Sequence, residues 1–157
     1  MSEHNPYTPP TTELRDAPVV SAGPPPMAVR VACGLVLASL AFGVLTLLPG
    51  VREPEPDPPG VLVFVLVTYL VFGGLTLWFT LRTWQGRHWG RWALFVYLAA
   101  GWVIYSFTFA DDMIHAPMAA LINIGCVALE VSACALLFFG AGARWFATLR
   151  ANARARA

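Results

Sequence analysis

The sequence predicts an all-α, polytopic membrane protein whose four transmembrane helices form a bundle. Hydrophobic residues make up 57% of the chain and charged residues only 12%, about half the charge of an ordinary soluble domain. Residues 31–51, 58–81 and 92–110 contain no charge, and residues 116–143 contain only Glu130. A helix needs about 20 apolar residues to cross roughly 30 Å of hydrocarbon. Because each stretch is long enough and apolar on all sides, a membrane span is favoured over a soluble amphipathic helix.

The segment before the first span, residues 1–26, is predicted to be a disordered, Pro-rich cytoplasmic tail. It contains seven prolines and lacks the apolar residues that would build a core. It also carries acidic residues where a signal peptide needs a basic region. The first span is therefore expected to remain in the mature protein.

The transmembrane domain is predicted to cover residues 27–140. Its spans are expected at about residues 27–48, 61–83, 90–110 and 117–140. Prolines and glycines end the first span and fill the loop after it, since proline lacks the backbone donor that a helix needs. Pro117 is placed at the start of the fourth span, a position that proline favours.

Residues 141–157 are predicted to form a short, basic, amphipathic helix at the membrane interface. Trp145, Phe146 and Leu149 fall on one side of such a helix, and arginines such as Arg150 lie largely opposite. This pattern is typical of a helix that lies on an anionic leaflet.

The arginines predict the orientation of the chain. If both termini are cytoplasmic, nine of the ten basic residues lie inside and only Arg52 lies outside. The nine are Arg15, Arg30, Arg82, Arg87, Arg91, Arg144, Arg150, Arg154 and Arg156. Such a bias is enough to set topology. Arginine without lysine, together with abundant Ala, Gly and Pro, suggests a GC-rich bacterial genome, so the expected location is a bacterial inner membrane.

Tryptophan and arginine cluster at the predicted cytoplasmic ends of the spans, where they normally mark the membrane interface. The predicted interfacial anchors are Arg82, Trp84, Arg87, Trp89, Arg91, Trp92, Arg144 and Trp145. The interface rule explains this cluster, and a net charge of +1 provides no basic face for nucleic acid. The lipid bilayer is the expected partner.

Glu130 lies near the middle of the fourth span. It shares one helical stripe with Asn123, Cys126 and Cys134, so it is expected to face protein. At about 1.5 Å of rise per residue, hydroxyl groups on the other spans fall at a similar depth. The candidate intramembrane polar site is Glu130, Asn123, Cys126, Ser39, Thr76 and Tyr97.

Three interpretations of Glu130 remain open. A charge near the bilayer centre is unfavourable by about 2.5–3.5 kcal/mol, and burial disfavours the ionised form. The first interpretation is therefore a neutral Glu130 that donates a hydrogen bond to a neighbouring helix. The second is proton coupling or cation binding in a small transporter. The third is a polar contact with another membrane protein.

Small residues on the spans would let helices approach closely, as association within lipid requires. They fit packing within the bundle and equally fit contact with another protein or self-association. They are Gly34, Ala38, Ser39 and Gly43, Gly73 and Gly74, and Gly125, Ala128 and Ser132.

No catalytic, cofactor or metal site is predicted. The three cysteines lie inside spans, where they behave as small hydrophobic residues rather than as a disulfide framework. Cys126 and Cys134 beside Glu130, with Cys33 at a depth similar to that of Cys134, could supply metal ligands. Because no loop motif or histidine is available to orient such ligands, packing explains them better. Asp111, Asp112 and His115 could bind a divalent ion, but helix capping and a solvated turn explain these residues at least as well.

Three segments resemble a known group of proteins: NPYTPP at residues 5–10, GRHWGRW at 86–92 and FFGAGARWF at 138–146. They are similar to segments of uncharacterised small four-helix inner-membrane proteins of proteobacteria. The resemblance implies a fold and a location, but no reaction and no site residues. The predicted function is thus a small accessory or interaction protein, not an enzyme. The alternative is a proton- or cation-coupled transporter centred on Glu130.

Overall fold

The computed structural model describes residues 23–48, 51 and 60–155, and every regular element within them is helical. Residues 1–22, most of the predicted disordered tail, lie outside the described residues. The helices are α1 (Met27–Val44), η1 (Leu45–Leu47), α2 (Val61–Trp84), α3 (His88–His115), α4 (Pro117–Phe138) and α5 (Gly140–Ala155). The all-helical prediction is confirmed for this part of the chain.

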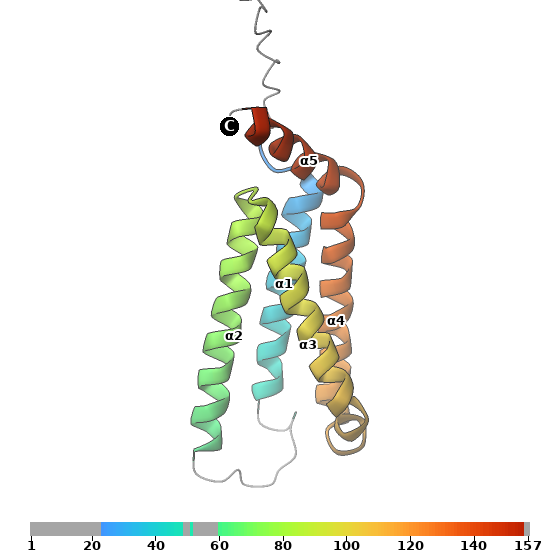
Figure 1. Cartoon of the computed structure of the whole chain (residues 1–157). Coiled ribbons are helices and arrows are strands. Elements are labelled where there is room, and N and C mark those ends of the chain that lie inside the picture. The colour runs from blue at the N-terminus through green and yellow to red at the C-terminus, as the bar shows by residue number, and fades with distance from the viewer. Residues whose placement is uncertain (1–22, 49–50, 52–59, 156–157) are drawn as a thin grey trace, which may run out of the picture.

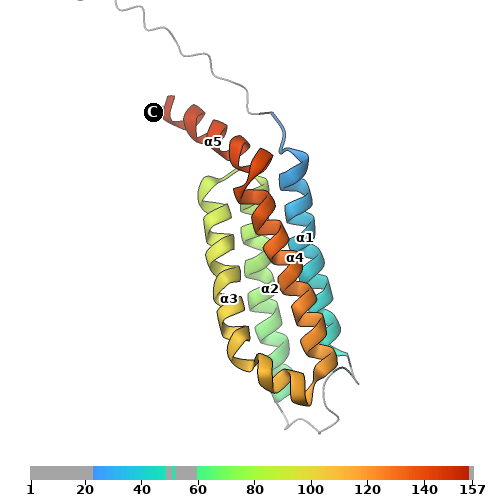
Figure 2. The ribbon, with the colours of Figure 1, turned by 90° about the vertical axis from the view of Figure 1, so that its right-hand side faces the viewer.

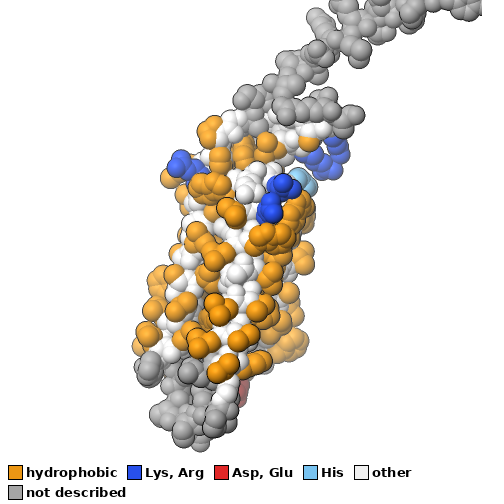
Figure 3. Space-filling view, turned by 90° about the vertical axis from the view of Figure 1, so that its left-hand side faces the viewer, with side chains coloured by type: hydrophobic (Ala, Val, Ile, Leu, Met, Phe, Trp, Pro, Cys, Tyr) orange, Lys and Arg blue, Asp and Glu red, His pale blue; other side chains and the backbone are white. Residues whose placement is uncertain are grey.

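Four of these segments are long and apolar enough to cross a membrane, as the charge-free stretches predicted. They are Met27–Leu47, Val63–Trp84, His88–His115 and Pro117–Phe138, with mean hydropathies between 1.7 and 2.1. Their outer surfaces are rich in large apolar side chains, which cover the length of the bundle (Figure 3). Leu70, Phe107 and Ile114, for example, are each at least 75% exposed.

The four long helices stand side by side in chain order, and α4 closes the bundle against α1 (Figures 1 and 2). The α1–α4 pair is the most extensively packed. The backbones of α1 and α3, and those of α2 and α4, do not approach each other closely among the described residues, so these pairs lie on the diagonals. This order decides which side chains can meet inside the bundle.

The core lies between α1, α3 and α4, at the end of the bundle that α5 covers. Small side chains on α4, such as Ala133 and Cys134, lie in one buried cluster with Ala32 and Cys33 of α1. Small residues bring helix backbones close together, which is the main source of packing energy between helices in lipid. The close contact between α1 and α4 follows from this composition.

The observed helix ends differ from the predicted ones at α3 and α4. α3 continues through Asp111 and Asp112 to His115 instead of ending near residue 110. A helix that has left the hydrocarbon can continue through acidic residues. α3 ends at His115, shortly before Pro117, because a proline cannot continue the helix. α4 begins at Pro117, as predicted, and ends at Phe138, two residues early, before a Gly140 with φ +63°.

α5 turns back over the end of the bundle and packs on the turn between α2 and α3 (Figure 2). Phe146 is fully buried, and Gly86 in that turn has φ +76°. A Cβ atom at Gly86 would lie 2.7 Å from Leu149 Cδ1 and 2.9 Å from Trp145 Cη2. The apolar side of α5, which the sequence assigned to lipid, therefore contacts the bundle itself.

Candidate functional site around Glu130

Glu130 is held by two helices other than its own. The Ser39 hydroxyl of α1 donates to Glu130 Oε1 at 2.6 Å. The Trp102 indole N–H of α3 donates to Glu130 Oε2 at 2.7 Å. Ser39 is buried, whereas Glu130 and Trp102 are half-buried. The carboxyl group therefore connects α1, α3 and α4 through hydrogen bonds at both of its oxygens.

The two bonds place different limits on the proton of Glu130. An indole N–H can only donate, so Oε2 must accept from Trp102. A hydroxyl can donate or accept, so a proton on Oε1 could be shared with Ser39. Within the described part of the chain, no arginine or histidine lies within ion-pair distance of Glu130. The site thus accommodates a neutral carboxyl group, or an ionised one whose counter-charge comes from elsewhere.

Thr76 and Tyr97, two of the predicted partners, meet each other rather than Glu130. The Thr76 hydroxyl lies 3.4 Å from the Tyr97 hydroxyl, which donates to the Phe72 carbonyl at 2.8 Å. Both side chains belong to the α2–α3 side of the bundle. They face the same cavity as Glu130 but do not bond to it.

Asn123 and Cys126 lie on the stripe that the sequence predicted. The Cys126 thiol donates to the Ser39 carbonyl at 3.4 Å, which adds a weak bond to the α1–α4 contact. Asn123 lines the cavity one turn further from α5. Cys33 and Cys134 are buried in the core instead. No group of three metal-ligating side chains is present among the described residues.

A cavity of about 330 Å³ lies beside Glu130, between α2, α3 and α4. Figure 1 shows α2 and α3 diverging from their connecting turn. The polar atoms of the lining converge from all three helices. The lining includes Phe72, Thr76, Tyr97, Trp102, Tyr105 and Asn123.

Trp102 is the site residue that sequence reasoning missed. The other tryptophans from Trp84 to Trp92 lie near the ends of spans, where an indole reaches the polar interface. Trp102 lies near the middle of the third span, where its N–H needs a partner inside the protein. The depth of this tryptophan, close to that of Glu130, was the available signal.

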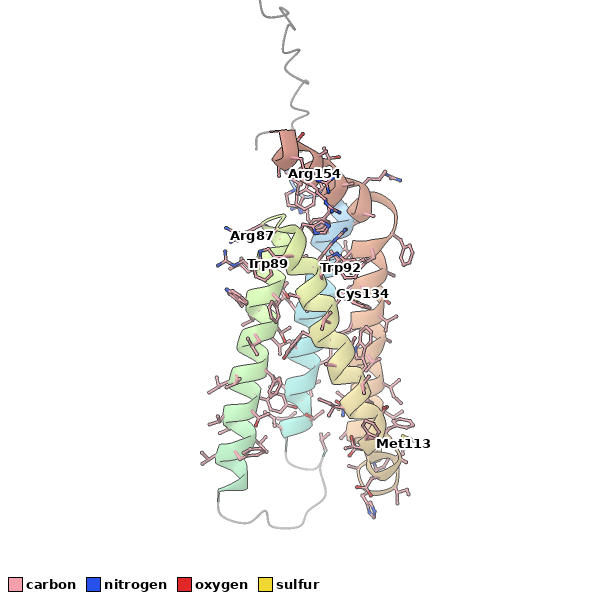
Figure 4. The ribbon with its side chains drawn as sticks, in the orientation of Figure 1. Arg87, Trp89, Trp92, Met113, Cys134 and Arg154 are labelled. Atoms are coloured by element: carbon pink, nitrogen blue, oxygen red, sulfur yellow. The ribbon has the colours of Figure 1, made fainter. Side chains whose placement is uncertain are left out.

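The predicted interfacial anchors gather at the end of the bundle that carries α5. Figure 4 places Arg87, Trp89 and Trp92 there, with Met113 at the opposite end of α3. Trp84, Trp89 and Trp92 are between 42% and 47% exposed, as anchors should be. Arg82 and Arg144 lie at the same end, in the last turn of α2 and in α5.

Arg91 and Trp145 are used differently from the other predicted anchors. The Arg91 guanidinium lies over the rings of Phe138 and Phe146, at 5.2 and 4.9 Å from their centroids. It also lies 3.1 Å from His88 Nε2. Trp145 packs edge-on against Phe146. Arg91 therefore helps to hold α5 on the bundle through Phe146, and Trp145 does so through its position next to the α2–α3 turn.

Comparisons of the chain with protein-family models, curated proteins and solved structures give no match.

Proposed function

We propose that the chain is a multi-pass protein of a bacterial inner membrane, with both termini in the cytoplasm. Support for the orientation comes from the arginines, since all seven in the described residues lie in α5 or at the ends of α1, α2 and α3 next to it. Figure 3 shows the basic side chains of one face gathered at that end. Basic residues favour the cytoplasmic side of a membrane. The exposed apolar sides of α2 and α3 then face lipid, and the basic side of α5 lies near the leaflet surface.

Within that membrane, we propose that the protein works as a small accessory or interaction protein, not as an enzyme. The observation that carries this proposal is an outward-facing stripe of small residues on α4. Gly125, Ala128, Ser132 and Ala135 are exposed and share one side of the helix. A Cβ atom added at Gly125 would meet nothing within 4 Å.

Such a stripe suits close approach by a membrane helix of another protein. Small residues let two backbones pack closely, and lipid offers no other strong reason for helices to associate. The inner side of α4 is already occupied, since Ala133 and Cys134 pack in the core. The outer stripe therefore takes no part in packing α4 into the bundle, which favours a partner helix outside the bundle.

Site-specific crosslinking in native membranes tests this role. A photoreactive residue at Ala128 is expected to capture a protein, whereas one at the exposed Leu70 of α2 should capture mainly lipid. Gly125→Leu should abolish the adduct by adding bulk to the stripe. Gly74→Leu, at another glycine with open space around it, is the matched control. An adduct of twice the chain's mass would indicate self-association, and lipid adducts alone at Ala128 would contradict the proposal.

A second candidate function is a proton- or cation-coupled carrier centred on Glu130. The cavity beside Glu130 favours it, because the carboxyl group has no basic side chain as counter-charge among the described residues. Intramembrane carboxyl groups are frequent proton and cation sites. Proteoliposomes should then move protons or cationic dyes, and Glu130→Gln should stop the flux while leaving the fold intact. Flux that survives in the Gln variant would remove Glu130 from the mechanism.

A further inference from the structure

The charge in the lining of the cavity determines whether a cation or an anion could bind there. Among the described residues that line the cavity, Glu130 is the only charged one. An ionised carboxylate that is half-buried and unpaired is unfavourable, because desolvation is not offset by an opposite charge. A cation inside the cavity would supply that charge. An anion would meet only repulsion there.

Aromatic rings around the cavity favour the same sign. Phe72, Tyr97, Trp102 and Tyr105 contribute to the lining from two helices. Ring faces attract cations through their quadrupole, most strongly where water is excluded. Tyr97 of α3 and Phe72 of α2 lie stacked, with centroids 6.3 Å apart, and both line the cavity. A cation in the cavity would thus meet both the carboxylate of Glu130 and aromatic rings.

The lining suits an organic cation better than a metal ion. Calcium and magnesium require six or more oxygen ligands. Here one carboxyl group faces the cavity, and its oxygens already accept bonds from Ser39 and Trp102. The remaining wall is largely apolar. An ammonium group needs one counter-charge, and its carbon substituents need such walls.

The size of the cavity limits the ligand. A volume of about 330 Å³ is at the lower end of the roughly 300–1,000 Å³ range of small-molecule sites. It suits one aromatic ring with a short ammonium arm, and not a large multi-ring cation.

We propose that the cavity between α2, α3 and α4 binds a small hydrophobic ammonium ion, with Glu130 as its counter-ion. This rests on the second candidate function in that it names the class of cation. Binding itself requires neither transport nor a partner protein. Ser39 and Trp102 act as positioning residues, because their hydrogen bonds fix the carboxyl group at the cavity wall.

The test is isothermal titration of the purified full chain in nonionic micelles, with empty micelles as the blank. The probes are 2-phenylethylammonium, 2-phenylethanol and phenylacetate, which share a skeleton and differ in charge. The ammonium ion is expected to bind saturably, about tenfold or more tighter than the alcohol, because it gains the carboxylate and the ring faces. Phenylacetate should not bind.

Three variants separate charge from shape. Glu130→Gln should reduce the affinity for the ammonium ion to that for the alcohol. Gly101→Leu should abolish binding of both, since Gly101 lines the cavity and has open space where the side chain would enter. Gly34→Leu, at an exposed glycine of α1 outside the lining, should bind as the wild type does.

Equal affinities for ammonium and alcohol, or no saturable binding by the wild type, would overturn the inference. Unchanged binding by Gly101→Leu would also overturn it, by placing the ligand elsewhere. If Glu130→Gln fails to fold, the wild-type ratio of ammonium to alcohol still decides the role of charge. Proton flux in proteoliposomes without ammonium binding would sink this inference and leave the carrier function standing.

Discussion

Replacing Trp102 with Phe tests whether Glu130 ties the bundle together. The change removes the indole N–H that lies 2.7 Å from Glu130 Oε2 and keeps an aromatic ring. Side-chain hydrogen bonds between membrane helices contribute about 0.6 kcal/mol on average and at most about 1.7. Ser39→Ala removes the corresponding bond at Oε1. Each variant should lower the free energy of unfolding by about 0.6 kcal/mol, and Trp102→Phe by somewhat more because part of a ring is lost.

Substitutions of Glu130 itself should follow from the same geometry. Glu130→Ala removes both bonds, so the loss is about 1.2 kcal/mol from hydrogen bonding alone. The Ser39 hydroxyl can then bond to a carbonyl of its own helix. The Trp102 N–H cannot, and an unsatisfied donor costs about 1–3 kcal/mol when buried. Glu130→Gln keeps one acceptor for Trp102 and gains an amide that can donate to Ser39, so its effect should stay below about 0.6 kcal/mol.

The measurement is reversible unfolding in mixed micelles of a mild detergent and sodium dodecyl sulfate, followed by circular dichroism. Ser132→Ala is the matched control, because Ser132 bonds only to the Ala128 carbonyl of its own helix, at 2.8 Å. It should change stability by less than about 0.3 kcal/mol. If Ser39→Ala and Trp102→Phe match Ser132→Ala while the fold is intact, Glu130 does not tie the helices and the reasoning fails.

Three further predictions concern the topology and α5. Reporter fusions after Arg156 and within residues 83–90 should report cytoplasm and those within 52–58 the opposite side; a C-terminus outside the cytoplasm would refute the four-span topology. A peptide of residues 141–157 should bind anionic vesicles, with each Arg contributing about 1 kcal/mol to the binding free energy, and salt should release it. Equal binding to neutral vesicles would exclude the electrostatic contribution. Gly86→Ala should weaken the packing of α5 on the bundle by about 1–2 kcal/mol, because φ at Gly86 is +76° and the added Cβ atom would clash with side chains of α5. Faster proteolysis within α5 checks this, and unchanged proteolysis would mean that α5 does not depend on the turn.

The long helices could be predicted because lipid-spanning segments are limited by length and charge. The absence of charge over residues 31–51, for example, indicates a span without knowledge of its neighbours. The end of α3 could not be placed in the same way. Asp111 and Asp112 mark where hydrocarbon ends, but a helix may continue beyond it, and here it does.

The contact between Ser39 and Glu130 could be anticipated from depth, whereas the placement of Thr76 could not. Rise per residue gives the position of a side chain along the bundle axis. It does not say which helices are neighbours. α2 lies diagonally across from α4, and Thr76 bonds to Tyr97 on the neighbouring α3 instead of to Glu130.

The sequence could not predict whether the small residues of α4 face the inside or the outside of the bundle. Gly125, Ala128 and Ser132 fit an inner or an outer interface by spacing alone. The structure shows them exposed, because Ala133 and Cys134 occupy the side that packs against α1. Helix rotation depends on all the packing partners at once, and spacing within one helix does not contain that information.

The hydrogen bond between Trp102 and Glu130 can be observed directly by nuclear magnetic resonance of the indole N–H groups in micelles. Trp102→Phe identifies the Trp102 resonance among those of the six tryptophans. We expect this N–H to exchange slowly with deuterium and to shift when Glu130 is replaced by Ala, while the resonance of the exposed Trp89 stays in place. A Trp102 resonance that is unmoved by Glu130→Ala, or that exchanges as fast as that of Trp89, would contradict the account of Glu130 as the group that connects α1, α3 and α4.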